Sequence, residues 1–166
     1  MVGDKDMGWY MAMKTLNLRG VGIEAVGRAR GLLSELLTYA KETSSHSGAL
    51  LRMPKTRSKL GQMATEIEAC RLAAYRVGWM QSQGLTLTHE TSVSKLLSSE
   101  MWQRFTHFAL QVLGLYGSLE RGSKAAPLDG RLGEAFISSI ADTIHLGTSE
   151  IHRNIIAQDG LGLPKE

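Results

Sequence analysis

The chain has 166 residues, of which 43% are apolar and 21% charged, and its formal net charge is +3. This composition suits one globular domain with a single core, and the scattered Lys and Arg residues argue against nucleic-acid binding. No apolar run is long enough to cross a bilayer, and no signal-peptide pattern opens the chain. The single cysteine, Cys70, excludes an internal disulfide and favours a reducing compartment, which we expect to be the cytoplasm.

Residues 1–18 come before the first long apolar pattern, and their stretch GWYMAMKTL is compatible with a short extended lead-in. From residue 19 onward, three long segments carry apolar side chains at spacings of three and four, which places each set on one helix face. We expect helices over Arg19 to Glu42, Pro54 to Gln83 and Thr88 to Gly114. Their apolar faces consist of Ala25, Ala29, Leu32, Leu33, Leu36, Leu37 and Ala40; Leu60, Met63, Ile67, Cys70, Ala74 and Val77; and Val93, Leu96, Leu97, Met101, Phe105, Phe108 and Val112.

Caps and breakers support these boundaries. Thr88 is a suitable N-cap because its hydroxyl oxygen accepts a hydrogen bond from a first-turn amide. Gly84 and Gly114 are typical of helix ends. The segment Ser118 to Gly130 is rich in Gly, Ser, Ala and Pro and predicts a loop.

Two shorter patterns follow, which predict a fourth helix and a short C-terminal helix that ends at Gly160. Long helices with short connections favour an antiparallel bundle. We therefore predict an all-α domain over residues 19–166: an antiparallel up-and-down four-helix bundle with an additional short C-terminal helix. The first and third faces are wide enough for a second subunit to bury part of them. The two shorter patterns are Leu132, Phe136, Ile140 and Ile144, and Ile151, Ile155 and Ile156.

The last helix starts at a Gly-Thr-Ser-Glu turn. Gly147 permits unusual backbone dihedrals, Thr148 is a good N-cap, and Glu150 in the first turn interacts favourably with the helix dipole. The amides of such a turn are also suited to binding an anion such as a phosphate. These residues fit either a simple cap or an anion site.

Two further stretches leave the same choice between structure and ligand binding. In QVLGLYG, Gln111 precedes Gly114 and Gly117, so that a backbone with little steric bulk lies beside a hydrogen-bonding amide. Helices end on glycine very often, so by itself the stretch favours a plain helix end. The basic stretch RMPKTRSK, residues 52–59, fits a phosphate contact or a solvated helix start.

Other chemistry finds little support. Asp142 and His145 have the spacing of half a di-iron site, but no second convincing pair accompanies them, so we predict no metal. Neither a nucleophile elbow nor a phosphate-binding Gly-Lys-Ser/Thr loop is present. Cys70 lies in an apolar helical pattern and is interpreted as a buried small hydrophobe.

Four stretches, in order, carry a resemblance to the C-terminal helical domain of the acyl-CoA dehydrogenase family of flavoproteins. They are VGDKDMGWYMAMKTLNLRG, KLGQMATEIEACRLAAYRVGWM, QVLGLYG and GTSEIHRNIIAQDGLGLPKE. The similarity covers nearly the whole chain. It implies that residues 1–18 lead in from a β-domain and that residues 19–166 form the helical domain.

The resemblance implies an FAD-dependent oxidoreductase that removes an α-proton and a β-hydride from an acyl-CoA. It also implies that the electrons pass to an electron-transfer flavoprotein and that the bundle forms homo- or hetero-oligomers. Neither nucleic acid nor a membrane is an expected partner. The positions that match FAD-contacting residues are Gln111, Gly114 and Leu115, which meet the adenine–pyrophosphate half from a neighbouring subunit, and Gly147, Thr148 and Glu150 in the C-terminal turn.

Several positions depart from the family pattern. Leu146 stands where many members have the catalytic glutamate, and residues 17–19, the place of the base in other members, contain no carboxylate. Thr43 stands at the place of an FAD-binding arginine, whereas Ser45 keeps the hydroxyl and Ser47 replaces a glycine.

Two explanations of these departures stay open. A sister chain supplies the base and the arginine in a mixed enzyme, or the chain is a relative that has lost the reaction. The alternative function is a non-catalytic helical interaction module that docks to a partner subunit. We favour the first explanation and expect this chain alone to be inactive and to bind FAD weakly, because an open bundle face cannot exclude water from a hydride transfer.

Overall fold

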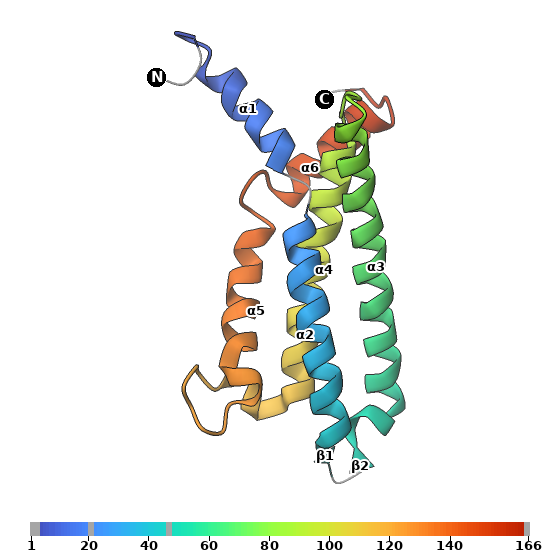
Figure 1. The fold of residues 1–166 in the computed structure, drawn as a ribbon, viewed down its shortest axis with the longest axis vertical. Coiled ribbons are helices and arrows are strands. Elements are labelled where there is room, and N and C mark those ends of the chain that lie inside the picture. The colour runs from blue at the N-terminus through green and yellow to red at the C-terminus, as the bar shows by residue number, and fades with distance from the viewer. Residues whose placement is uncertain (1–3, 20–21, 46–47, 165–166) are drawn as a thin grey trace.

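The structure, a computed structural model, describes residues 4–19, 22–45 and 48–164, without the side chains of residues 13, 14, 16–19, 45 and 48. It confirms an all-α domain, with one two-residue antiparallel hairpin in addition (Figure 1). The elements are α1 (Gly8–Arg19), α2 (Ile23–Glu42), β1 (Ser44–Ser45), β2 (Gly48–Ala49), η1 (Leu50–Arg52), α3 (Pro54–Ser82), α4 (Glu90–Leu113), η2 (Gly114–Ser118), η3 (Pro127–Gly130), α5 (Arg131–Asp142), α6 (Ser149–Ile155) and the π-helical turn η4 (Ile156–Gly160).

The four long helices run alternately down and up, as predicted (Figure 1). Helix α4 is central, since it packs against α2, α3 and α5. The short α6 crosses the bundle beside the start of α4. We call this the α6 end, and we call the opposite end, which holds β1, β2, η1 and η2, the hairpin end.

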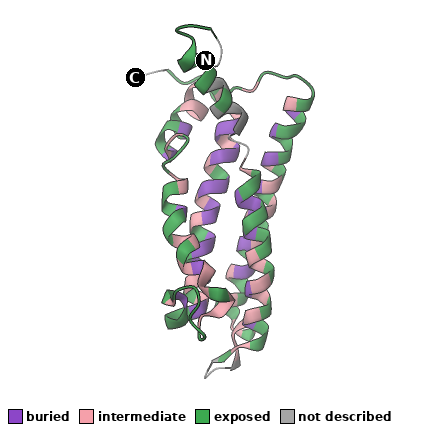
Figure 2. Ribbon diagram, turned by 60° about the vertical axis from the view of Figure 1, so that its left-hand side comes forward, coloured by how far each residue is buried: buried purple, intermediate pink, exposed green. Residues whose placement is uncertain are grey.

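Buried residues line the inward faces of the helices, as the purple segments of Figure 2 show. All six residues of the predicted α3 face are buried, including Cys70. In α2, Ala25, Ala29, Leu36 and Ala40 are buried, and the three other predicted leucines pack against the core from its edge. Trp102 and Phe105 of α4 stack in the centre of the core with ring centroids 5.9 Å apart.

The predicted face of α4 is right in its second half and wrong in its first. Met101, Phe105 and Phe108 are buried, whereas Leu97 is 41% exposed. The first half of α4 buries a polar set instead, which consists of Thr91, Ser92, Ser94, Lys95, Ser98 and Ser99. The Ser98 and Ser99 hydroxyls donate to the Lys95 carbonyl of their own helix, so the helix backbone itself satisfies them.

The prediction of an extended lead-in is wrong, because residues 8–19 form helix α1, which extends away from the bundle in Figure 1. Helix α2 then starts later than predicted, after Gly22 in the left-handed conformation (φ 70°). A Cβ at Gly22 would lie 2.2 Å from Ser98 Oγ, so close packing against α4 requires glycine here.

The helix ends agree with the predicted breakers but not with the predicted cap. Gly84 follows α3 and Gly114 caps α4, both with positive φ, and η4 ends at Gly160 as expected. The N-cap of α4 is His89 rather than Thr88, and the Thr88 amide instead donates to the Glu90 carboxylate at 3.0 Å. The predicted loop 118–130 ends in the η3 turn.

The predicted face of α5 is buried only at Leu132, while Ile140 and Ile144 are exposed. None of the helices in the described part of the chain has the length and apolar character needed to span a membrane.

Candidate functional site

The predicted cofactor-contacting residues lie at opposite ends of the bundle. Gln111 is near the end of α4 and is followed by Gly114 and Leu115 in η2, at the hairpin end. The turn 147–150 lies at the α6 end, where Lys95 Nζ is 3.2 Å from the Gly147 carbonyl oxygen. Since Gln111 follows Lys95 by four to five helical turns, the two groups are about 24 Å apart along α4.

The amides at the start of α6 find acceptors within the chain. Thr148 Oγ1 accepts from the Ile151 amide at 3.3 Å, and the Ser149 amide donates to the Thr143 carbonyl at 3.1 Å. Hydrogen bonds from its own amide and from Thr148 lower the pKa of the Glu150 carboxyl. The turn therefore caps its helix, and a contact between this turn and a cofactor stays a prediction.

Leu146, which the resemblance predicts to stand at the position of the family base, has an unusual backbone conformation. Its φ is 58° and that of Gly147 is 98°. A left-handed conformation costs about 1–2 kcal/mol for a residue with a side chain. A Cβ at Gly147 would lie 2.9 Å from His152 Nε2, which explains the glycine.

A buried lysine and a buried histidine hold this turn in place. Lys95 Nζ donates to the carbonyl oxygens of Asp142 (2.7 Å) and Gly147 (3.2 Å). His152 Nε2 lies 3.2 Å from the Leu146 carbonyl oxygen, which only accepts, so Nε2 carries the proton and Nδ1 accepts from the Ser92 hydroxyl at 3.1 Å. Hydrogen bonds to the carbonyl oxygens of Asp142, Leu146 and Gly147 thus hold the backbone around Leu146.

Electrostatics around the turn follow from burial. Lys95 is 6% exposed and His152 9% exposed. Burial lowers the pKa of Lys95, and burial together with the nearby Lys95 charge lowers the pKa of His152. His152 is therefore a neutral imidazole at neutral pH. The sequence analysis missed both residues, and the signal that marks them is a lysine among serines, SVSKLLSS, on a helix.

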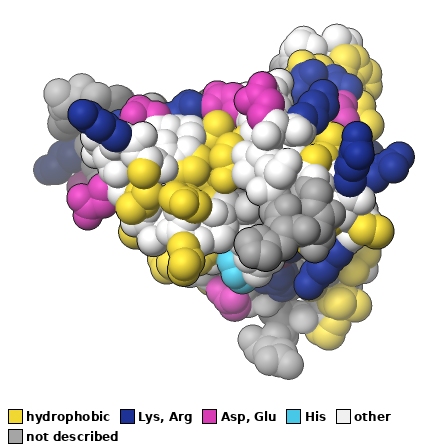
Figure 3. All heavy atoms as spheres, turned by 90° about the horizontal axis from the view of Figure 1, so that it is seen from below, with side chains coloured by type: hydrophobic (Ala, Val, Ile, Leu, Met, Phe, Trp, Pro, Cys, Tyr) yellow, Lys and Arg dark blue, Asp and Glu magenta, His cyan; other side chains and the backbone are white. Residues whose placement is uncertain are grey.

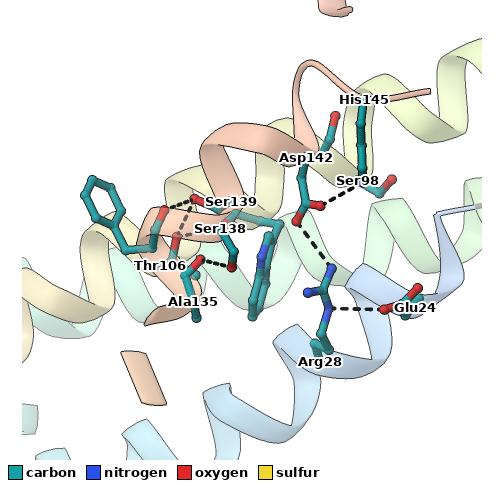
Figure 4. Close-up of polar contacts among 12 residues, drawn as sticks. Glu24, Arg28, Ser98, Thr106, Ala135, Ser138, Ser139, Asp142 and His145 are labelled. Atoms are coloured by element: carbon teal, nitrogen blue, oxygen red, sulfur yellow. Dashed lines mark hydrogen bonds and ion pairs between the residues drawn. The ribbon is translucent and has the colours of Figure 1, made fainter. Parts of the chain in front are cut away.

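Beside Leu146 lies a hollow of about 370 Å³ with a chain of ion pairs (Figure 4). Asp142 contacts His145 Nε2 at 3.3 Å and Arg28 at 3.3 Å, and Arg28 also lies 3.9 Å from Glu24. Arg28 stacks over Trp102 at 4.8 Å. Both carboxylates in this hollow thus have cationic partners, and within the described ranges no group of three metal-binding side chains forms.

The hairpin end carries two hollows as well. Gln111 is exposed, with its side-chain nitrogen 3.3 Å from His107, and it lines a hollow of about 510 Å³ together with Lys55 and Lys59. Gly114 lines a second, apolar hollow of about 840 Å³ between the end of α4 and α5. Leu115 is 92% exposed, so it is available to a second molecule.

Thr43, at the predicted position of the family arginine, directly precedes the hairpin. Thr43 caps α2 by donating its amide to the Tyr39 carbonyl at 2.9 Å. Ser45 belongs to β1, where its backbone pairs with Gly48, but its side chain lies outside the description. Ser47 and the side chains of residues 17–19 lie outside it as well.

Comparisons with known proteins agree with this fold. Residues 6–161 match the family described as acyl-CoA dehydrogenase, C-terminal domain. The chain is 31% identical over 159 residues to the short-chain specific acyl-CoA dehydrogenase, mitochondrial, of Bos taurus, and the match covers 95% of this chain and 37% of that protein. The chain belongs to the acyl-CoA dehydrogenase family.

Solved structures show the same bundle. The acyl-CoA dehydrogenase from Geobacillus kaustophilus has a TM-score of 0.84 and 26% identity over 97% of this chain and 40% of its own. The ChsE4-ChsE5 complex from Mycobacterium tuberculosis has a TM-score of 0.86 and 25% identity over 99% of this chain and 42% of its own. The chain thus spans about 40% of the length of these two solved chains, and it matches the C-terminal domain of the family.

Proposed function

We propose that the chain is the FAD-contacting and oligomerisation domain of an acyl-CoA dehydrogenase-like flavoprotein and contributes no catalytic base of its own. The observation that carries this proposal is Leu146, which sits in a turn held by Lys95 and His152 at the position of the family base. FAD, when bound, accepts the hydride from the β-carbon of the acyl-CoA. Leucine accepts no proton, so Leu146 contributes no base. The proposed role of this chain's residues is therefore to bind FAD and to orient it.

The residues present fit FAD better at the hairpin end than at the α6 end. At the hairpin end, Gln111 and two lysines face a hollow whose donors suit a diphosphate. At the α6 end, the first amides of α6 already have acceptors within the chain. The separation of about 24 Å along α4 supports an assembly in which each FAD lies between two chains.

We further propose a mixed enzyme in which a sister chain supplies the glutamate base and the arginine that Thr43 lacks. One structural relative is a complex of two different named chains, ChsE4 and ChsE5. The exposed Leu115 and the exposed isoleucines of α5 offer apolar surface for such an assembly. Acyl-CoA is the proposed substrate and an electron-transfer flavoprotein the proposed electron acceptor, and we expect this chain alone to be inactive.

Two organisational proposals complete this assignment. Residues 1–18 connect to a preceding β-domain, in part through α1, and residues 19–166 form the helical domain. We place the protein in the cytoplasm because its one cysteine is a buried thiol, and burial raises the pKa of Cys70 to about 11, which suits a structural residue in a reducing compartment.

Flavin stoichiometry after co-expression with a full-length sister subunit tests the proposal. We expect Gln111→Ala and Thr148→Pro to lower flavin occupancy while the two chains still co-purify. Gln83→Ala, at an exposed glutamine after α3, is the matched control and should leave occupancy unchanged.

The second candidate is a non-catalytic interaction module, which Leu146 and the hydrogen-bonded amides of the α6 turn favour. In that case the same variants would leave flavin occupancy unchanged, and a complex without flavin bound to this chain would still assemble.

A further inference from the structure

Two hollows lie one after the other along the side of α2 that faces α5. The first is the hollow of about 370 Å³ beside Leu146, which Ile23 also lines. The second has a volume of about 350 Å³ and begins about one turn further along α2. Among the described lining residues Arg28 belongs to both, so the two hollows are neighbours. We call the second one the Trp102 hollow, which is lined, among others, by Gly27, Arg28, Gly31, Leu32, Trp102 and Ala135.

The Trp102 hollow contains a hydrogen-bond donor without an acceptor. Trp102 is 1% exposed, and within the described residues its Nε1 has no hydrogen-bond partner. An indole N–H only donates, and leaving a buried donor unpaired is destabilising. The Arg28 guanidinium lies over the indole ring, 4.8 Å from the ring centroid, but it likewise only donates. An oxygen acceptor from outside these residues would therefore remove the cost of the unpaired indole.

The α2 wall of the same hollow lacks side chains at two positions one turn apart. A Cβ at Gly27 or at Gly31 would meet no atom within 4 Å. Both glycines lie inside α2, where glycine is less favourable than alanine. Since close packing among the described residues explains neither glycine, we assign both to the space that they leave in the hollow.

The charged groups around the Trp102 hollow compensate one another. Figure 4 shows Arg28 reaching from α2 to Asp142 of α5. Side chains of both charges also lie next to one another along the upper edge of the hairpin end in Figure 3. An ionic ligand group would have to displace an existing ion pair, whereas an uncharged oxygen would not. Each arginine that lines the hollow has a carboxylate partner, and the pairs are Arg28–Asp142, Arg121–Glu134 and Arg131–Glu35.

We propose that the Trp102 hollow binds the far end of the acyl group and that Trp102 Nε1 donates a hydrogen bond to an uncharged oxygen there. The substrate class is thus an acyl-CoA whose chain carries a ketone or hydroxyl oxygen near its end. This inference rests on the proposed function, because it takes the α-carbon of the bound acyl-CoA to lie beside Leu146.

The spacing of the two hollows sets the length of such a chain. Ile23 and Gly31 are eight residues apart on α2, which corresponds to about 12 Å. An extended chain advances about 1.2 Å per bond, so about ten bonds cover this distance. Arg28 lies between the two hollows, and 40% of its side chain is exposed. An acyl group of about twelve carbons therefore reaches from Leu146 to Trp102.

The test compares two α,β-unsaturated acyl-CoA ligands of about twelve carbons, one with a ketone on its penultimate carbon and one without. These ligands have the form of the product of the proposed reaction, so they bind without being oxidised. Calorimetry on the full-length gene product, in complex with its sister subunit and with flavin bound, gives the Kd of each. In the wild type we expect the ketone to lower the Kd about tenfold.

Trp102→Phe removes the donor and keeps an aromatic ring. We expect the ketone to change the Kd of this variant by less than about twofold. The preference is a ratio of two affinities measured on one protein, so a general loss of stability does not imitate its loss. A wild type without preference, which is the result expected if only water satisfies the indole, would overturn the proposal, as would an undiminished preference in Trp102→Phe.

Gly31→Leu fills the Trp102 hollow from the α2 side. It should raise the Kd of both ligands at least about fivefold, whereas the melting temperature without ligand should not fall, because leucine favours a helix more than glycine does. Gly61→Leu is the matched control on α3, where a Cβ also meets nothing within 4 Å, and it should change neither Kd by more than about twofold. Wild-type affinities in Gly31→Leu would place the end of the acyl group elsewhere and overturn the proposal.

The outcomes distinguish this inference from the proposed function. If the complex holds flavin and binds both ligands equally well, the Trp102 subsite is wrong and the proposed function stands. If the complex prefers the ketone through Trp102 but this chain holds no flavin, the subsite stands and the FAD assignment fails. If neither ligand binds, the acyl-CoA assignment and the subsite fail together.

Discussion

The two ends of α4 contrast in how their polar groups are used. At the α6 end, Lys95, Ser92 and His152 are buried and bonded to the backbone around Leu146. At the hairpin end, Gln111, Lys55 and Lys59 face an open hollow. Buried polar groups that are hydrogen-bonded to the backbone define one backbone geometry, whereas exposed groups are available to a ligand. The first end thus preserves a conformation, and the second is where binding is to be sought.

Lys95→Met should have the largest effect and tests the structural role of the α6 end. Methionine keeps the volume but removes both donors from the carbonyls of Asp142 and Gly147. We expect the free energy of unfolding in urea to fall by about 2–3 kcal/mol. Lys59→Met, at the hairpin end, should change it by less than about 0.5 kcal/mol. Equal losses of unfolding free energy in the two variants would contradict a structural role that is confined to the α6 end.

Gly147→Ala should destabilise by about 2 kcal/mol, because φ is 98° and the new Cβ meets His152 at 2.9 Å. Gly61→Ala is the matched control on α3, where the new Cβ meets nothing within 4 Å. This control should be neutral or stabilising by up to about 1 kcal/mol. Thermal unfolding of both variants is the measurement. Equal destabilisation by the two would show that the protein responds to any glycine substitution and that strain at Gly147 is not the cause.

Acidification should weaken the α6 end selectively. Burial and Lys95 lower the pKa of His152 in the folded state below the ordinary value of about 6.5. As the pH falls, His152 is therefore protonated in the unfolded chain before it is protonated in the folded one. The stability that depends on neutral His152 is present above about pH 6.5 and is lost as the pH falls below it. His152→Gln should flatten this dependence between pH 7 and pH 5. If the free energy of unfolding of this variant, measured by urea titration, fell as steeply with pH as that of the wild type, the effect would belong to other groups.

Leu115→Ser should have the smallest effect on the stability of the single chain. It tests whether the hairpin end is an assembly surface. Since the side chain is 92% exposed, the free energy of unfolding should change by less than about 0.5 kcal/mol. Assembly with a sister subunit should weaken, as sedimentation at decreasing concentration will show. Wild-type assembly of this variant would place the interface elsewhere.

Much of the fold was predictable because apolar periodicity records it. The α3 face is correct throughout, as are the glycine helix ends and the bundle topology. The first half of α4 was mispredicted because a hydropathy pattern scores serine and lysine as exposed. Here Ser98 and Ser99 bond to their own helix, and Lys95 finds carbonyls 47 and 52 residues away.

The candidate site was predicted only in part for the same reason. The sequence analysis assigned Gln111 and Thr148 to one set of predicted cofactor-contacting residues. The helix cap formed by Thr148 is confirmed. The sequence carried no information on their separation by about 24 Å, nor on Lys55 and Gln111 sharing a hollow, since both depend on how α3 and α4 pack.

The sequence by itself determined the family and the helical class, because local spacing and motif order are written along the chain, and it predicts Leu146 in place of a base. Only the tertiary structure decided that a buried lysine and histidine hold the turn around Leu146 and that the basic stretch at α3 faces Gln111. Those relations join residues distant in sequence, and they exist only once packing has buried Lys95 and His152 and brought the start of α3 beside the end of α4.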